Sequence, residues 1–156
     1  MMHTWFECKI RYEKTMENGM NKKVTEPYLV DALSFTEAEA RIIEEMTPYI
    51  SGEFTVSDIK RARYSELFFA EDAEADRWFK CKLTFITLDE KSGSEKKTST
   101  NVLVQASDLR DAVKKLDEGM KGSMADYIIA SVAETAIMDV YPYSSEPNDK
   151  PEFPGA

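Results

Sequence analysis

Hydrophobic and polar residues alternate in two stretches of the chain, residues 5–14 and residues 78–88. In the first stretch Phe6, Cys8 and Ile10 share one face, and charged residues dominate the other. Such alternation is typical of a half-buried β-strand, because successive side chains of a strand point to opposite faces. The pattern therefore predicts two matching strands, each with one face toward a core.

Both stretches begin with the same short motif, which contains both tryptophans and both cysteines of the chain. The two copies are Trp5-Phe6-Glu7-Cys8-Lys9-Ile10 and Trp78-Phe79-Lys80-Cys81-Lys82-Leu83. They lie 73 residues apart, and the same offset relates Ser34 to Ser107, Ile59 to Val132, Glu66 to Asp139 and Phe68 to Tyr141. A fixed offset along most of the chain indicates an internal repeat.

Further elements of the first copy follow from turn, cap and periodicity signals. Asn18-Gly19 predicts a reversal, and residues 28–33 predict the returning strand. Thr36 and Glu39 have the spacing of a capping box for a helix that ends near Pro48. A β-rich run over residues 54–69 completes the unit, and its imperfect alternation predicts a bulge.

The second copy shows the same order. Ser92-Gly93-Ser94 predicts the reversal, residues 101–106 the returning strand, Ser107 the cap of a helix through Met120, and residues 127–143 the last extended run. Each copy is thus a ββαβ unit. The expected fold class is α+β, with six strands and two helices in an internal duplication packed as one pseudo-two-fold-symmetric body.

Length and composition favour one domain over residues 1–143. Its two repeats are residues 4–69 and 77–142, joined by an acidic linker at residues 70–76. Residues 144–156 are rich in proline and cannot build a core, so we expect an extended tail that contacts a protein partner.

The net charge of −9 argues against a general polyanion-binding protein, although much of the negative charge lies in the linker and the tail. No segment has the length and hydropathy of a membrane helix, and the amino terminus does not resemble a secretion signal. These features predict a cytoplasmic protein with no membrane contact, in which Cys8 and Cys81 remain thiols.

Candidate residues for catalysis and metal binding are few. The single histidine, His3, and two cysteines are too few and too badly spaced for a structural zinc site. The glycines do not have the spacing of a phosphate-binding loop, and the paired carboxylates have the character of solvated faces. We therefore expect a non-enzymatic protein with no catalytic residue, no metal and no cofactor.

The predicted outer faces of the strands carry the most informative chemistry. Tryptophan next to cations on a sheet is the arrangement that binds single-stranded nucleic acid, since bases stack on the ring and cations meet phosphates. The candidate residues are Trp5, Lys9, Arg11, Lys60, Arg61, Arg63, Trp78, Lys80 and Lys82. The alternative is that each ring packs under a helix, on the other repeat or in an oligomer interface, where tryptophan is enriched.

The chain also resembles an uncharacterised domain family of gut Bacteroidetes and their phages and mobile elements. The segments that carry the resemblance are Trp5-Phe6-Glu7-Cys8-Lys9, Ser34-Phe35-Thr36-Glu37-Ala38-Glu39-Ala40 and the strand from Ile59 to Phe68, and it covers residues 4–143. The resemblance implies a bacterial or phage host and an accessory role, and it brings no catalytic residue.

Two functions from different classes follow. The first is a non-enzymatic accessory protein that binds single-stranded nucleic acid through the duplicated Trp/Lys face. The second is an oligomeric protein-interaction module, with Trp5 and Trp78 in interfaces. The solvent exposure of the two rings discriminates between these functions.

Overall fold

Over residues 4–123 and 126–142, the computed structural model contains eight strands in two four-stranded sheets and two helices. The α+β fold class is as expected. The chain divides into two compact units. Unit 1 consists of the segment that ends at Ala62 and the segment that begins at Ile137, and unit 2 consists of residues 63–136. The expected tail, residues 144–156, lies outside the described residues.

Unit 1 is a sheet with strand order β3-β1-β2-β8. Its elements are β1 (Trp5–Thr15), β2 (Asn21–Asp31), α1 (Phe35–Met46), β3 (Phe54–Ala62) and β8 (Val140–Tyr141). The first three strands pair antiparallel, whereas β8 pairs parallel with β2. The hairpin reverses at Gly19, whose φ of 83° explains the glycine of the predicted turn.

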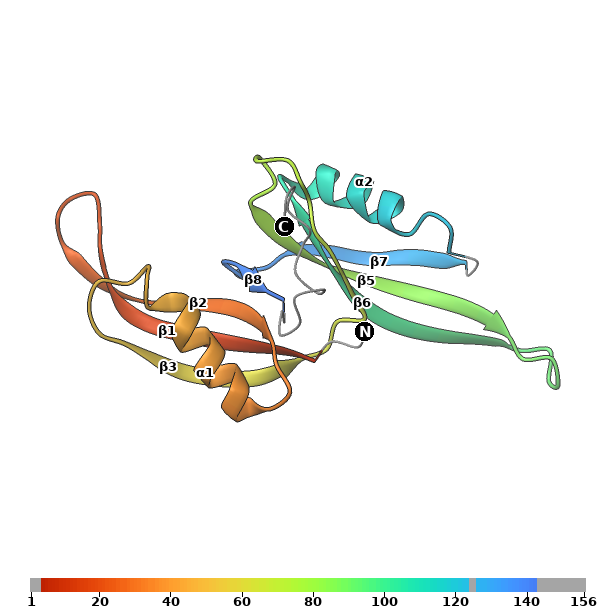
Figure 1. Ribbon diagram of the computed structural model, residues 1–156. Coiled ribbons are helices and arrows are strands. Elements are labelled where there is room, and N and C mark those ends of the chain that lie inside the picture. Colours follow the sequence, from red (N-terminus) through yellow and green to blue (C-terminus); the bar gives the residue numbers. More distant parts are fainter. Residues whose placement is uncertain (1–3, 124–125, 143–156) are drawn as a thin grey trace, which may run out of the picture. The chain divides into compact units, whose positions relative to one another are not determined.

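Unit 2 has the strand order β4-β6-β5-β7. Its elements are β4 (Glu66–Phe68), β5 (Arg77–Leu88), β6 (Glu95–Ala106), α2 (Leu109–Gly119) and β7 (Tyr127–Glu134). Here β4 pairs parallel with β6, and the other pairs are antiparallel. Figure 1 shows each helix lying across one face of the sheet of its own unit.

The expectation of six strands is wrong, because each final β-rich run is broken into two strands. The first run breaks after Ala62, which pairs with Trp5, the first residue of β1, so that β3 has reached the end of its partner. The chain then enters unit 2, where β4 adds to β6. The second run breaks after Glu134, which pairs with Phe79, and its last part, β8, adds to β2 of unit 1.

The bulge expected in each final strand is confirmed. The pairing of β1 with β3 shifts register between Lys9 and Ile10, and the pairing of β5 with β7 shifts between Lys82 and Leu83. As a result, Ser57 and Ala130 have no pairing partner on the central strand. An extra residue of this kind bends an edge strand and changes which face its later side chains occupy.

The helix-facing side of each sheet forms its core, as the alternation predicts. The six residues expected to be buried are all at most 2% exposed: Phe6, Cys8, Ile10, Phe79, Cys81 and Leu83. In unit 1 they pack with Ala38, Ile42 and Met46 of α1, and in unit 2 Leu116 of α2 joins the core. Lys82 is exposed, as expected, and Lys9 is partly exposed.

Both helix caps differ from the expected ones. Ser34, not Thr36, caps α1: its Oγ accepts a hydrogen bond from the Glu37 N–H, and the Glu37 carboxylate accepts one from the Leu33 N–H. Asp108, not Ser107, caps α2. Each helix begins directly after a residue in extended conformation, and the first side-chain oxygen that can reach the N3 N–H becomes the cap.

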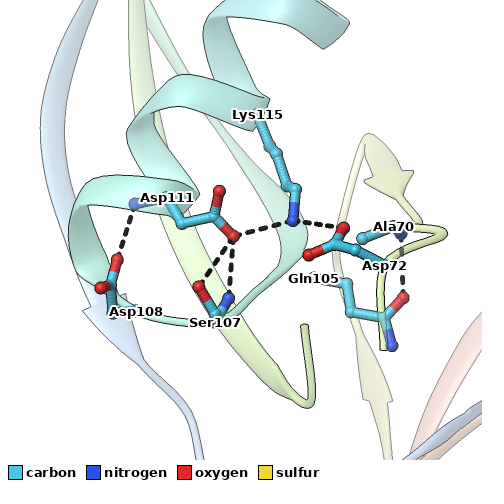
Figure 2. Close-up of polar contacts among 7 residues, drawn as sticks. All are labelled: Ala70, Asp72, Gln105, Ser107, Asp108, Asp111 and Lys115. Atoms are coloured by element: carbon cyan, nitrogen blue, oxygen red, sulfur yellow. Dashed lines mark hydrogen bonds and ion pairs between the residues drawn. The ribbon is translucent and has the colours of Figure 1, made fainter. Parts of the chain in front are cut away.

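The acidic segment after β4 is held against α2 within unit 2. The Lys115 Nζ lies 2.7 Å from Asp111 and 2.8 Å from Asp72, so the lysine joins helix and segment (Figure 2). The Ala70 N–H also donates to the Gln105 side chain of β6 at 3.0 Å. Asp111 in turn accepts hydrogen bonds from the N–H and the hydroxyl of Ser107.

The packing of β1 and β5 generates the first prediction. Ile10 and Leu83 are 0% exposed, so replacing either by alanine leaves a cavity, and we expect the free energy of unfolding to fall by roughly 2–5 kcal/mol. Chemical denaturation measures this loss. Lys82→Ala is the matched control, because an exposed side chain should change stability by only about 0.5 kcal/mol. Unchanged stability of both core variants would contradict the assigned faces.

The Lys115 contacts generate a second prediction. The hydrogen bond from Lys115, and then the Ser107 N–H, lower the pKa of Asp111 to about 2. We expect Lys115→Met to raise the pKa of Asp111 toward the value of an ordinary aspartate, as measured by NMR titration of the carboxyl carbon. Lys114→Met, one residue earlier on the exposed side of the helix, serves as control. An Asp111 pKa that moves equally in both variants would exclude a specific contact.

Candidate nucleic-acid interface

The two tryptophans do not present free rings. Both lie on the expected outer face, but Trp5 is 5% exposed and Trp78 is 2% exposed, so the expectation that their rings are open to solvent is wrong. In unit 2 the chain that follows β4 covers the Trp78 end of the outer face: Phe69 meets the Trp78 ring edge-on at 5.3 Å, and Ala70 is bonded to Gln105, the cross-strand partner of Trp78. Buried rings cannot act as stacking platforms for bases, nor as anchors in an oligomer interface.

Beyond Trp78, the outer face of unit 2 is open and basic. Lys80 and Lys82 project from this face of β5, and Lys97 projects from the same face of β6, opposite Ile86. All three lysines are exposed. Within the described part of the chain, none of their side chains makes an ion pair or a hydrogen bond.

The cross-strand neighbours of Lys80 and Lys82 are uncharged. Lys80 lies opposite Leu103 and Ala133, and Lys82 lies opposite Asn101 and Ser131. Among the described strand residues of this face the one carboxylate is that of Glu95, which lies two residues from Lys97 on β6 and far from Lys80 and Lys82. Lys80 and Lys82 therefore form a cationic surface that no carboxylate of the described strands neutralises locally, whereas Lys97 lies close to Glu95.

The outer face of unit 1 is charge-balanced instead. Lys60 pairs with Glu7 at 3.8 Å, and Lys9 lies opposite Asp58. Arg11 is exposed on the same face and lies opposite Thr55. Unit 1 therefore has the expected cations, but carboxylates lie next to them.

Two of the expected site residues are not part of either outer face. Arg61 pairs with Phe6, which places it on the helix-facing side at the edge of the sheet. Arg63 follows β3 and begins unit 2. The structure thus brings together Lys80 and Lys82, and it separates them from Arg61. Lys97 was not among the predicted site residues because the returning strand was predicted to begin at residue 101. The polar residues Lys97, Ser99 and Asn101 alternate in the same register and would have extended that strand toward residue 95.

Neither cysteine has the features of a reactive thiol. Burial raises the pKa of the Cys8 thiol to about 12 and that of the Cys81 thiol to about 11, so both remain protonated at neutral pH. In the ranges 4–123 and 126–142, no three metal-ligating side chains cluster. No helix in this described part is long and apolar enough to cross a membrane.

Unit 1 contains a cluster of polar side chains on the helix-facing side of its sheet. The hydroxyls of Tyr12 and Tyr28 donate to the Glu26 carboxylate at 2.9 Å and 3.2 Å, and Glu26 is only 9% exposed. Lys14 lies 3.7 Å from the same carboxylate. Burial, followed by the hydrogen bond to Glu26, raises the pKa of Tyr12 to about 12. Burial and the nearby Glu26 charge also raise the pKa of Tyr28.

A cleft of about 930 Å³ adjoins this cluster. It lies between the β1–β2 hairpin, including Tyr12 and Lys14, and the loop after α1, including Tyr49 and Gly52. The corresponding core positions of unit 2 are apolar or small: Phe85, Thr100 and Val102 stand where unit 1 has Tyr12, Glu26 and Tyr28. The cleft contains both acidic and basic side chains and is open, so its charge indicates no ligand class.

The chain belongs to a family of domains described as Domain of unknown function (DUF4494), whose family model matches residues 4–143. A search of curated proteins and a search of solved structures found no match. Family membership thus covers the sequence from β1 to β8 and assigns no activity.

The tyrosine cluster generates a prediction about alkaline pH. The folded-state pKa of Tyr12, about 12, lies above its ordinary value of 10.0, so its stabilising contribution is complete below pH 10 and is lost as the pH rises toward 12. We expect the unfolding free energy of Tyr12→Phe to fall less steeply between these pH values than that of the wild type. Denaturant titrations at several pH values measure the slope.

The control for this prediction is Tyr49→Phe. The Tyr49 side chain is 79% exposed, and its removal should leave the alkaline slope unchanged. Equal slopes for the wild type and Tyr12→Phe would show that Tyr12 ionises without affecting folding.

Proposed function

We propose that this chain is a non-enzymatic accessory protein that binds single-stranded nucleic acid through the outer face of the unit 2 sheet. The observation that carries the proposal is the pair Lys80 and Lys82, which are exposed on one face with uncharged cross-strand neighbours. Lys97 lies further along the same face, and none of the three side chains has an ion-pair partner among the described residues. Such a surface attracts phosphates, and neutralising phosphates is the main source of affinity for nucleic acid.

The binding mode differs from the one that the sequence suggests. Because Trp5 and Trp78 are buried, binding rests on lysine–phosphate contacts and on hydrogen bonds from neighbours such as Asn101 and Ser131. Contacts of this kind do not read base identity, so we expect binding to be tolerant of sequence and strongly dependent on salt. The net charge of −9 opposes tight binding to duplex DNA, whose charge density is higher.

We also propose that the two units arose by duplication of one ββαβ unit. The support comes from equivalent pairings: Cys8 opposes Tyr28 and Ile59 in unit 1, and Cys81 opposes Val102 and Val132 in unit 2. Both central strands have a bulge opposite the same position, and each unit has one short parallel strand. In this proposal the basic face is a feature that unit 2 has and unit 1 does not.

The alternative function, a protein-interaction module, now lacks its original support, since the tryptophans are not at a surface. It rests instead on the unpaired edge of β7, an 8-residue strand at one side of the unit 2 sheet. An exposed strand edge can pair with another chain.

The function predicts a specific effect of the lysines. Lys80→Ala, Lys82→Ala and Lys97→Ala should each lower the slope of log affinity against log salt by about 0.7, because each removes one phosphate contact on a single strand. Fluorescence anisotropy of a labelled oligo(dT), at three or more salt concentrations, measures the slope. Stability should change little, because the side chains are exposed.

Lys60→Ala is the matched control, because this exposed lysine lies on the outer face of unit 1 and is paired with Glu7. Its slope should equal that of the wild type. Absence of binding by the wild type at low salt, or an equal loss in Lys60→Ala, would contradict the proposal.

A further inference from the structure

The edges of the two sheets differ in how they are protected from pairing with other chains. The outermost strands are β3 and β8 in unit 1 and β4 and β7 in unit 2. Strands β8 and β4 have 2 and 3 residues, which is too short for a strand of another chain to pair with them stably. Strand β3 is longer but carries Asp58, Lys60 and Arg61, and charged residues are the usual protection of an edge.

Strand β7 is longer and its centre is uncharged, so the bulge at Ala130 is the one protective feature of this edge among its described residues. Figure 1 shows it, in light blue, next to β5 at the side of its sheet. Its 8 residues carry no charge from Tyr127 to Ala133, and Ile128 is 53% exposed. No residue of β7 makes a backbone hydrogen bond on its outer side to the rest of the described chain. The strand therefore offers a row of unpaired backbone groups with apolar side chains.

The bulge makes this strand compatible with a second copy of itself. An antiparallel pair centred between Ala130 and Ser131 places Ile128 opposite Ala133 and Ile129 opposite Val132. In a regular strand these residues would lie on opposite faces, but the extra residue Ala130 reverses the alternation. Ile128 and Ala133 then share the outer face, and Ile129 and Val132 share the helix-facing side.

Charge also favours a second copy. In this register the single carboxylate of the strand, Glu134, lies opposite Tyr127, and no like charges face each other. We propose that the chain forms a two-fold-symmetric dimer through antiparallel pairing of β7 with β7 of a second copy. The four-stranded sheet of unit 2 in one copy then joins the same sheet of the second copy to form one continuous sheet. Lys80 and Lys82 of both copies lie on the same outer surface of that sheet.

The test is the size of the 156-residue chain, measured by sedimentation equilibrium. We expect a dimer for the wild type. Ala130→Lys, at the exposed centre of the pair, places two ammonium groups next to each other and should weaken dimerisation by about tenfold or more. Ala130→Glu should do the same with two carboxylates. An equimolar mixture of the two variants should restore the dimer, because opposite charges then meet.

Ser57→Lys is the matched control, since Ser57 is the bulged residue of β3 in the same position of unit 1. It should remain a dimer, and thermal unfolding should confirm that all variants are folded. A wild type that stays monomeric at hundreds of micromolar would overturn the proposal. So would a Ser57→Lys variant that dissociates like Ala130→Lys, or a charge-swapped mixture that fails to associate. Dimerisation does not depend on nucleic acid, so failure of either proposal can be recognised separately.

Discussion

The parallel addition of two short strands constrains the whole fold. After β3 the chain leaves unit 1 to place β4 beside β6, and after β7 it returns to place β8 beside β2. Few hydrogen bonds carry these additions, for example from the Leu29 N–H to the Asp139 carbonyl at 3.0 Å and from the Met138 N–H to the Pro27 carbonyl at 2.9 Å. Unit 1 is therefore complete only when the last described residues have been placed. Its closing contact pairs Leu29 with Val140, which lie 111 residues apart (140 − 29), so closing this loop costs more entropy than closing a hairpin.

The path of the chain after β4 also determines which part of the outer face of the unit 2 sheet stays exposed to solvent. The residues that follow β4 must turn back toward β5, and in doing so they cover Trp78 with Phe69 and attach Ala70 to Gln105. Lys115 then fixes the acidic segment to α2 by its bonds to Asp72 and Asp111. The covered end of the sheet is apolar and the uncovered end carries the lysines, so the path of the chain separates a buried tryptophan from an exposed basic surface.

The sequence predicted the features that depend on neighbouring residues. Alternation assigned the buried faces of β1 and β5 correctly, and glycine located the hairpin turns. It could not predict that β3 ends at Ala62, because that end is set by the length of β1 as a partner, not by any residue of the run itself. The burial of Trp5 and Trp78 was missed for a related reason. Alternation tells which face a side chain occupies, but a segment distant in sequence decides whether that face is covered.

The two units share a backbone plan, so their side-chain differences indicate where their roles differ. Under α1, unit 1 keeps a carboxylate hydrogen-bonded to two tyrosines, and burying such a group is costly unless all its partners are in place. Unit 2 has Phe85 and Val102 at the equivalent positions, so its core is apolar. The outer faces differ in charge balance. Unit 1 pairs Lys60 with Glu7, whereas Lys80 of unit 2 has no counter-charge among the described residues. Unpaired surface charge adds little to stability, since even a surface ion pair contributes only about 0–1 kcal/mol. Folding therefore gives no reason for an unbalanced lysine face on unit 2 alone, and this is why we propose an anionic ligand for it.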